Sequence, residues 1–157
     1  MKVLIIYYSR SGTVKEMAHV IGNFIKDKGV AVRVVFVEDI SAKDLLEYDG
    51  IIVGSPTYYG SMAAEVKRLF DDTVAFHGKL DGKVGGAFSS SANLGGGNET
   101  TVLSILEAML IHGMIIQGDW QGDHYGPVAI EEIDKRCKEI CKRFAERFVN
   151  LLKKVGS

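Results

Sequence analysis

Short apolar runs alternate with amphipathic segments along this chain. Val3–Tyr8 is a continuous run of apolar and β-branched residues, a pattern typical of a strand buried on both faces. In the segment that follows, apolar residues recur every three or four positions, which predicts an amphipathic helix over Thr13–Lys28. Gly29 then ends this helix, as glycines often do. The chain therefore begins with a predicted strand, a short loop and a helix.

The same alternation continues to the other end of the sequence. The further elements expected are strands over Val30–Val37, Gly50–Ser55, Lys83–Ser89 and Met114–Gly118, a helical turn near Ala42–Glu47, and helices over Ala63–Phe76, Glu99–His112 and Ile130–Lys154. Val74 is one of the residues expected on the buried face of its helix. Strands that alternate with helices predict a parallel sheet with helices on both faces. Right-handed crossovers favour a doubly wound five-stranded sheet of order 2-1-3-4-5, in one α/β domain over residues 1–157.

Composition narrows the classes of protein that fit this pattern. Hydrophobic residues make up 46% and charged residues 25%, as in ordinary globular proteins, and the net charge of −1 offers no basic surface for nucleic acid. No apolar run reaches the roughly 20 residues of a membrane span, and residues 1–20 lack a signal-peptide pattern, so we expect a cytoplasmic protein. Cys137 and Cys141 fit buried free thiols better than a disulfide within one helix or a zinc site, which needs more ligands.

Three unusual loops follow the first, third and fourth strands, whose carboxyl ends should meet at one edge of the sheet. SRSGT (Ser9–Thr13) has three hydroxyl residues and a glycine before a helix, which favours a phosphate cradle over a simple helix cap. SPTYYGSM (Ser55–Met62) offers flat tyrosine rings, although a tight turn with surface tyrosines is the alternative. SSSANLGGGNETT (Ser89–Thr101) offers hydroxyls and close backbone approach, with Asn98 as an N-cap; a flexible linker is the alternative.

Together these loops describe a ligand that carries both a phosphate and a planar ring, such as flavin mononucleotide (FMN). The competing nucleotide motifs are missing, because no G-x-G-x-x-G follows a strand and no G-x-x-x-x-G-K-[ST] occurs. A phosphoacceptor receiver domain shares the topology but needs acidic residues after the first strand, where Tyr8 and Ser9 stand instead. The loops therefore favour FMN.

With these motifs in order, the chain resembles the flavodoxin-like FMN proteins, and in particular the WrbA family of NAD(P)H:quinone oxidoreductases. The phosphate loop of that family is similar to YYSRSGTVKEMA (Tyr7–Ala18), its ring-binding loop to GSPTYYGSMAAEVKRLFD (Gly54–Asp71) and its third flavin loop to FSSSANLGGGNETT (Phe88–Thr101). Two further family positions match IHGM (Ile111–Met114) and HYGP (His124–Pro127). The resemblance runs over essentially the whole chain and implies a flavodoxin-like fold.

Carried over residue by residue, the resemblance implies the cofactor-binding positions. They are Ser9, Arg10, Ser11, Gly12, Thr13 and Val14 at the phosphate, Pro56, Thr57, Tyr58, Tyr59 and Gly60 at the isoalloxazine ring, and Ser90, Ser91, Ala92, Asn93, Leu94 and Gly95 on the other side of the flavin. No metal ligands are expected. The chain departs from the family at Ile111, where a histidine is usual, and around Glu38–Asp44, where a long insertion is reduced to a few residues.

The resemblance leaves two functions open. One is an enzyme in which NADH or NADPH reduces FMN and the electrons pass to a small-molecule acceptor such as a quinone; the other is an electron carrier that docks on a redox partner protein. The net charge of −1 favours the enzyme, because carriers are usually strongly acidic, whereas the shortened insertion favours the carrier. His112 is the one candidate catalytic residue, with a structural histidine as the alternative. The resemblance also leaves a homo-oligomer open.

Overall fold

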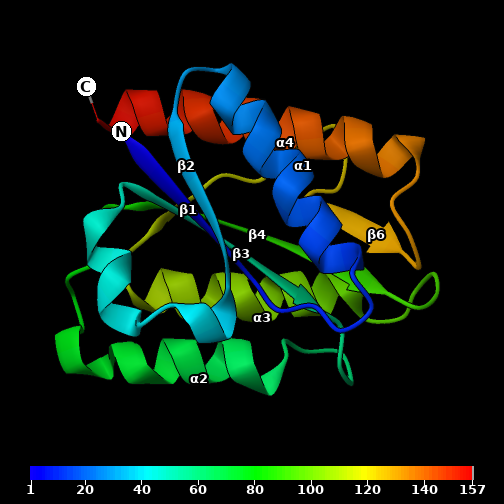
Figure 1. The fold of residues 1–157 in the computed structure, drawn as a ribbon, viewed down its shortest axis with the longest axis horizontal. Coiled ribbons are helices and arrows are strands. Elements are labelled where there is room, and N and C mark those ends of the chain that lie inside the picture. The colour runs from blue at the N-terminus through cyan, green and yellow to red at the C-terminus, as the bar shows by residue number, and fades with distance from the viewer. Residues whose placement is uncertain (157) are drawn as a thin grey trace.

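A twisted parallel sheet runs through the middle of the molecule (Figure 1). The computed structural model describes residues 1–156. Its strands are β1 (Lys2–Tyr7), β2 (Ala31–Phe36), β3 (Gly50–Pro56), β4 (Val84–Ser91), β5 (Ile115–Ile116) and β6 (Val128–Ile130). Every pairing is parallel, in the order β2-β1-β3-β4-β5, with β6 added to β4. The expected doubly wound sheet of order 2-1-3-4-5 is confirmed.

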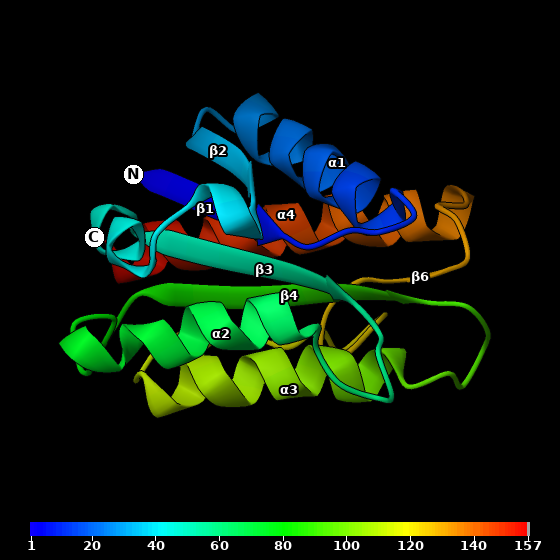
Figure 2. The same cartoon turned by 60° about the horizontal axis from the view of Figure 1, so that its bottom comes forward.

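Helices cover both faces of this sheet (Figure 2). On one face lie α1 (Thr13–Asp27) and α4 (Lys135–Val155), and on the other lie α2 (Ala64–Asp72) and α3 (Asn98–Ile111). The connections also contain three short 3₁₀ turns, η1 (Val37–Asp39), η2 (Ala42–Glu47) and η3 (Thr73–Phe76). Within residues 1–156, no helix is both long and apolar enough to cross a membrane.

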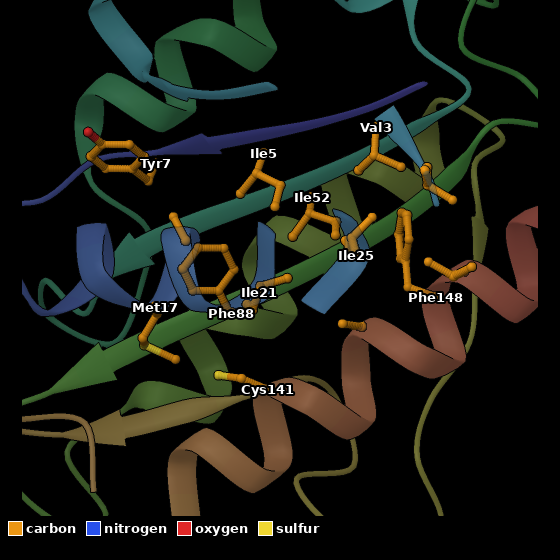
Figure 3. Close-up of a cluster of buried hydrophobic side chains, with 14 of the residues drawn as sticks. Val3, Ile5, Tyr7, Met17, Ile21, Ile25, Ile52, Phe88, Cys141 and Phe148 are labelled. Atoms are coloured by element: carbon orange, nitrogen blue, oxygen red, sulfur yellow. The ribbon is translucent and has the colours of Figure 1, made fainter. Parts of the chain in front are cut away.

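Each face of the sheet has its own hydrophobic core because successive side chains of a strand point to opposite faces. Along β1, Val3 and Ile5 pack on the side of α1 and α4, whereas Leu4 and Ile6 pack on the side of α2 and α3. Figure 3 shows the first of these cores, in which Phe88 of β4 is fully buried. This two-sided burial explains why the central strands read as continuous apolar runs.

The cysteines of α4 behave as the sequence predicts. Cys137 and Cys141 are free thiols with no exposed surface, and they belong to the core between α4 and the sheet. Asp134 is the N-cap of α4, and its carboxylate accepts a hydrogen bond from the backbone N–H of Cys137 at 2.7 Å.

The expected helix over Ile130–Lys154 is wrong at its start. Val128–Ile130 forms β6, which pairs with Ser89–Ser91 because β4 extends two residues past its expected end. The helix begins only at Lys135, after the Asp134 cap. The fifth strand is also shorter than expected, with two residues in place of Met114–Gly118.

The expected helix over Ala63–Phe76 is likewise wrong at its end. Its regular part stops at Asp72, where the hydroxyl of Thr73 donates a hydrogen bond to the carbonyl of Phe70 at 2.5 Å, and the chain tightens into η3. Val74 is therefore turned out of the core and is 77% exposed. A side-chain hydroxyl that bonds its own backbone in this way competes with regular helix.

Candidate functional site

The loops after β1, β3 and β4 meet in one cleft of about 570 Å³ at the carboxyl ends of these strands. The residues that line it are Ser9, Arg10, Ser11, Val14, Pro56, Thr57, Tyr58, Ser90, Ser91, Ala92 and Glu131. Ten of these eleven residues belong to the set expected to hold a cofactor. A cleft of this volume suits a small-molecule ligand or cofactor.

The first loop ends in a helix start that no side chain caps. Gly12 occupies the N-cap position with a φ of +103°, and the hydroxyl of Ser9 accepts a hydrogen bond from the backbone N–H of Gly12 at 3.1 Å. Among the residues that the structure describes, none accepts a hydrogen bond from the backbone N–H of Thr13, Val14 or Lys15. These donors and the positive end of the helix dipole suit an anion.

The second loop is held by its neighbours on β4 and by an internal turn. The backbone N–H of Thr57 donates to the carbonyl of Ser90 at 2.8 Å, and the backbones of Tyr58 and Ser61 exchange two hydrogen bonds of 3.0 and 3.1 Å. Tyr58 lines the cleft, with its ring edge-on to Tyr8 at a centroid distance of 6.3 Å. One side of the cleft therefore presents an aromatic ring.

Two residues expected at the ring do not line the cleft. Tyr59 has a left-handed backbone with a φ of +50° and a fully exposed side chain, because it forms the tip of the Tyr58–Ser61 turn. Gly60 follows it with a φ of +77° and packs towards Thr100, where an added Cβ would lie 3.4 Å from the hydroxyl oxygen. The role of Tyr59 at the ring therefore stays a prediction.

Buried polar groups shape the third loop. Asn98 is the first residue of α3 rather than its N-cap, which is Gly97, and its side-chain amide donates to the hydroxyl of Ser91 at 2.9 Å. That hydroxyl in turn donates to the carbonyl of Asn93 at 2.9 Å. Within residues 1–156 the hydroxyl of Ser90 has no hydrogen-bond partner, so it can serve a ligand in the cleft.

The outer half of the third loop, residues 93–95, does not line the cleft. Leu94, which is 83% exposed, and Gly95 line a neighbouring groove of about 630 Å³ together with Asp123 and Arg136, and Asn93 lines neither hollow. The expectation that Asn93, Leu94 and Gly95 border the same ligand as Ser90 therefore stays a prediction. Gly95 and Gly97 both have a positive φ, which lets the chain turn before α3 begins at Asn98.

Glu131 lines the cleft although sequence reasoning missed it. The hydroxyl of Thr13 donates to the carbonyl of Glu131 at 2.7 Å, and the backbone N–H of Glu131 donates to the carbonyl of Ser91 at 2.8 Å. The residue was overlooked because it fell inside an expected helix. Asp134, a good N-cap residue, was the signal that could have moved the start of that helix past Glu131.

The loop between β5 and β6 lies against α4 rather than over the cleft. Arg143 binds the carboxylate of Asp119 through two hydrogen bonds of 2.5 and 2.8 Å, and this guanidinium lowers the pKa of Asp119 below its ordinary value. Arg136 binds Asp123 in the same loop at 2.9 Å. Trp120, between these two anchors, is 75% exposed and does not line the cleft.

His112 lies at the opposite end of α3 from the cleft. The helix starts beside the cleft at Asn98 and runs for 14 residues, about 20 Å. The His112 ring is buried, with Nε2 2.8 Å from the hydroxyl oxygen of Thr73. Burial, with a smaller effect of His77, lowers the pKa of His112 below its ordinary value. The burial of His112 and its contact with Thr73 favour the structural alternative, and its catalytic role stays a prediction.

Taken together, the sheet order, the uncapped helix start and the ring-sized cleft define a doubly wound nucleotide-binding protein. A family model described as NADPH-dependent FMN reductase matches residues 41–125. A flavodoxin from Aquifex aeolicus is 39% identical over 155 residues, which cover 93% of this chain and 84% of that protein. An NAD(P)H dehydrogenase (quinone) from Chromohalobacter salexigens is 35% identical, over 85% of this chain and 77% of its own length.

The solved structures agree with these sequence relatives. A flavodoxin from the domain Archaea superposes with a TM-score of 0.82 at 30% identity, and the match covers 98% of this chain and 99% of the other. The chain belongs to the flavodoxin-like family of FMN-binding reductases. The resemblance and the fold expected from the sequence are thereby confirmed.

Proposed function

We propose that the protein binds FMN in the cleft of the three loops and uses it as an NAD(P)H:quinone oxidoreductase. The observation that carries this proposal is the construction of the cleft. Unpaired backbone N–H groups lie at one end, Tyr58 lies on one side, and Tyr59 stands outside instead of covering the opening. The family model favours an NADPH-dependent reductase, and the quinone dehydrogenase relative favours a quinone as the acceptor.

The residues present fit FMN. The backbone N–H groups at the start of α1, together with the hydroxyl of Ser11 and the guanidinium of Arg10, would hold the phosphate. The free hydroxyl of Ser90 would donate to or accept from the flavin, and Tyr58 would pack against its ring. Bound FMN would supply the redox chemistry by accepting a hydride and passing electrons to the acceptor.

An enzyme of this kind needs one face of the ring to be reachable, because hydride transfer requires the reacting atoms to lie about 3–3.5 Å apart. The exposed position of Tyr59 supports that requirement, since its side chain occupies no part of the cleft. Tyr58 then offers an apolar edge against which a nicotinamide or quinone ring can lie. The short η1–η2 segment, which replaces the longer insertion of the family, also adds no residue to the cleft.

The test is anaerobic mixing of the FMN-loaded protein with NADH or NADPH, followed by absorption spectroscopy. We expect the visible flavin absorbance to fall within minutes and to return when benzoquinone is added. Free FMN at the same concentration is the control for reduction without the protein. If dithionite bleaches the bound flavin and neither nucleotide does, the enzyme proposal is wrong.

The second candidate is an electron carrier without a small-molecule substrate. It is favoured by the flavodoxin relatives, because the archaeal flavodoxin superposes with a TM-score of 0.82 and the Aquifex aeolicus flavodoxin is 39% identical. The same experiment separates the two functions. A carrier keeps its flavin oxidised in the presence of either nucleotide and is reduced only by dithionite.

A further inference from the structure

Glu131 adopts a backbone conformation that its side chain disfavours. Its φ is +60°, and Tyr59 is the one other non-glycine residue in the described chain with a positive φ. The left-handed region suits glycine, asparagine and aspartate, whereas a longer side chain such as that of glutamate gains no local compensation there. Strain of this kind persists where the surrounding structure enforces it, and it is concentrated at functional sites.

The surrounding structure enforces the conformation from both sides. The hydroxyl of Thr13, at the start of α1, donates to the carbonyl of Glu131 at 2.7 Å, and the N–H of Glu131 donates to the carbonyl of Ser91 at 2.8 Å. The next residue, Glu132, closes back on the carbonyl of Ile130 at 2.7 Å. Glu131 is therefore fixed between the phosphate end of the cleft and the end of β4.

Glu131 differs chemically from the other residues that line the cleft. The groups around it are mainly donors, namely backbone N–H groups, the guanidinium of Arg10 and serine hydroxyls. Among the described residues that line the cleft, Glu131 is the one with a carboxylate, which is an acceptor only. Between its phosphate and its ring, FMN carries a chain of hydroxyl groups that donate hydrogen bonds.

We propose that the carboxylate of Glu131 accepts hydrogen bonds from the hydroxyls of the ribityl chain and so selects flavins that carry this chain. The inference rests on the proposed function, because it requires a flavin in the cleft. A carboxylate repels a phosphate dianion, so its favourable partner is the neutral part of the ligand beyond the phosphate. The strained turn holds Glu131 at the wall of the cleft at the expense of local stability.

The test compares the apoprotein and its Glu131→Gln variant in fluorescence titrations with FMN, riboflavin and lumiflavin, which has a methyl group in place of the hydroxylated chain. The amide of the variant keeps an acceptor oxygen but loses the charge that strengthens the hydrogen bonds, so riboflavin should bind roughly tenfold more weakly and lumiflavin should be unchanged. FMN should weaken less than riboflavin, because its phosphate also loses a repulsive neighbour. Glu132→Gln is the matched control, because Glu132 is the neighbouring exposed carboxylate and does not line the cleft. It should bind all three ligands as the parent does.

Each other result overturns the inference. Unchanged or tighter riboflavin binding in Glu131→Gln would show that the carboxylate makes no hydrogen bond to the ribityl chain. Weakening of FMN alone would assign the residue to the phosphate, and equal weakening of lumiflavin would assign it to the ring. If the parent itself fails to bind FMN, the proposed function fails as well. A parent that binds FMN beside an unaffected variant leaves the proposed function standing and refutes only the role of Glu131.

A second variant separates binding from stability. Asparagine tolerates the left-handed region and lacks the carboxylate, so Glu131→Asn should unfold at the same temperature as the parent apoprotein or higher, while it binds riboflavin more weakly. A lower midpoint of thermal unfolding, with the loss of binding in proportion, would make Glu131 a structural residue of the turn and overturn the inference.

Discussion

Gly97→Ala should weaken FMN binding by forcing two walls of the cleft apart. Gly97 has a φ of +91°, and a Cβ at this position would lie 2.9 Å from the Cα of Gly60 and 3.3 Å from the side chain of Thr57. Both neighbours belong to the loop after β3. Because the nearest atom is backbone, it cannot turn aside as a flexible side chain would. The loops after β3 and β4 would have to separate by roughly half an ångström to reach ordinary van der Waals contact.

The size of the effect follows from two separate costs. A Cβ in the left-handed region costs about 1–2 kcal/mol, and an overlap in a packed region adds about 1–3 kcal/mol. Gly95→Ala is the matched control in the same loop, because its φ is +67° and no atom lies within 4 Å of the added Cβ. The control therefore carries only the first cost. If the loops must return to their native spacing around FMN, most of the second cost enters the dissociation constant, which should rise about tenfold.

The assay is a fluorescence titration of the apoproteins with FMN, together with urea unfolding of the parent and both variants. Gly97→Ala should bind FMN about tenfold more weakly than Gly95→Ala, while both variants lose stability. Equal dissociation constants in the two variants would show that the contact between the loops does not set the width of the cleft.

Three further outcomes are expected. Ser11→Ala should cost about 1.5–3 kcal/mol of FMN affinity in calorimetric titration while riboflavin binding stays unchanged, because we propose that the Ser11 hydroxyl donates to the phosphate. Equal losses for both ligands would refute this role. Gly54→Ala should lower the free energy of unfolding in urea by about 3 kcal/mol, since its Cβ would overlap the buried ring of Phe88, and adding Phe88→Leu should restore part of it. The lowered pKa of His112 makes the folded chain bind fewer protons than the unfolded chain, so the free energy of unfolding should fall as the pH drops below about 6.5. His112→Gln should reduce this dependence of the free energy of unfolding on pH, and an unchanged dependence would contradict the role given to His112.

The parts of the fold that the sequence predicts well are those with strong local patterns. Val3–Tyr8 and Gly50–Ser55 are long enough to be recognised as buried strands, and α1 begins at Thr13 as expected. Val128–Ile130 has only three residues, too few for a periodic signal, and it becomes a strand because the end of β4 offers it a partner. Short elements of this kind depend on tertiary pairing and cannot be derived from local sequence.

The candidate site also has parts that the sequence predicts and parts that it does not. The hydroxyl-rich loop at Ser9–Thr13 is recognisable because its residue types and its place before a helix both favour an anion. Tyr58 and Tyr59 are neighbouring residues of the same type, so the sequence does not distinguish them. Tyr58 lines the cleft and Tyr59 is exposed because of their different positions in the turn. Glu131 reaches the cleft through a hydrogen bond to Thr13, 118 residues away in the chain. No local pattern reports a contact of that separation.

The end of β4 explains how three irregular loops can form one preformed cleft. Three successive residues of this strand each hold a different connection: the N–H of Ser89 donates to the carbonyl of Pro127, the carbonyl of Ser90 accepts from Thr57, and the carbonyl of Ser91 accepts from Glu131. Because β4 is paired with both β3 and β6 at this point, these three residues have little freedom to move. The cleft thus takes its shape from a central strand of the sheet rather than from its loops alone.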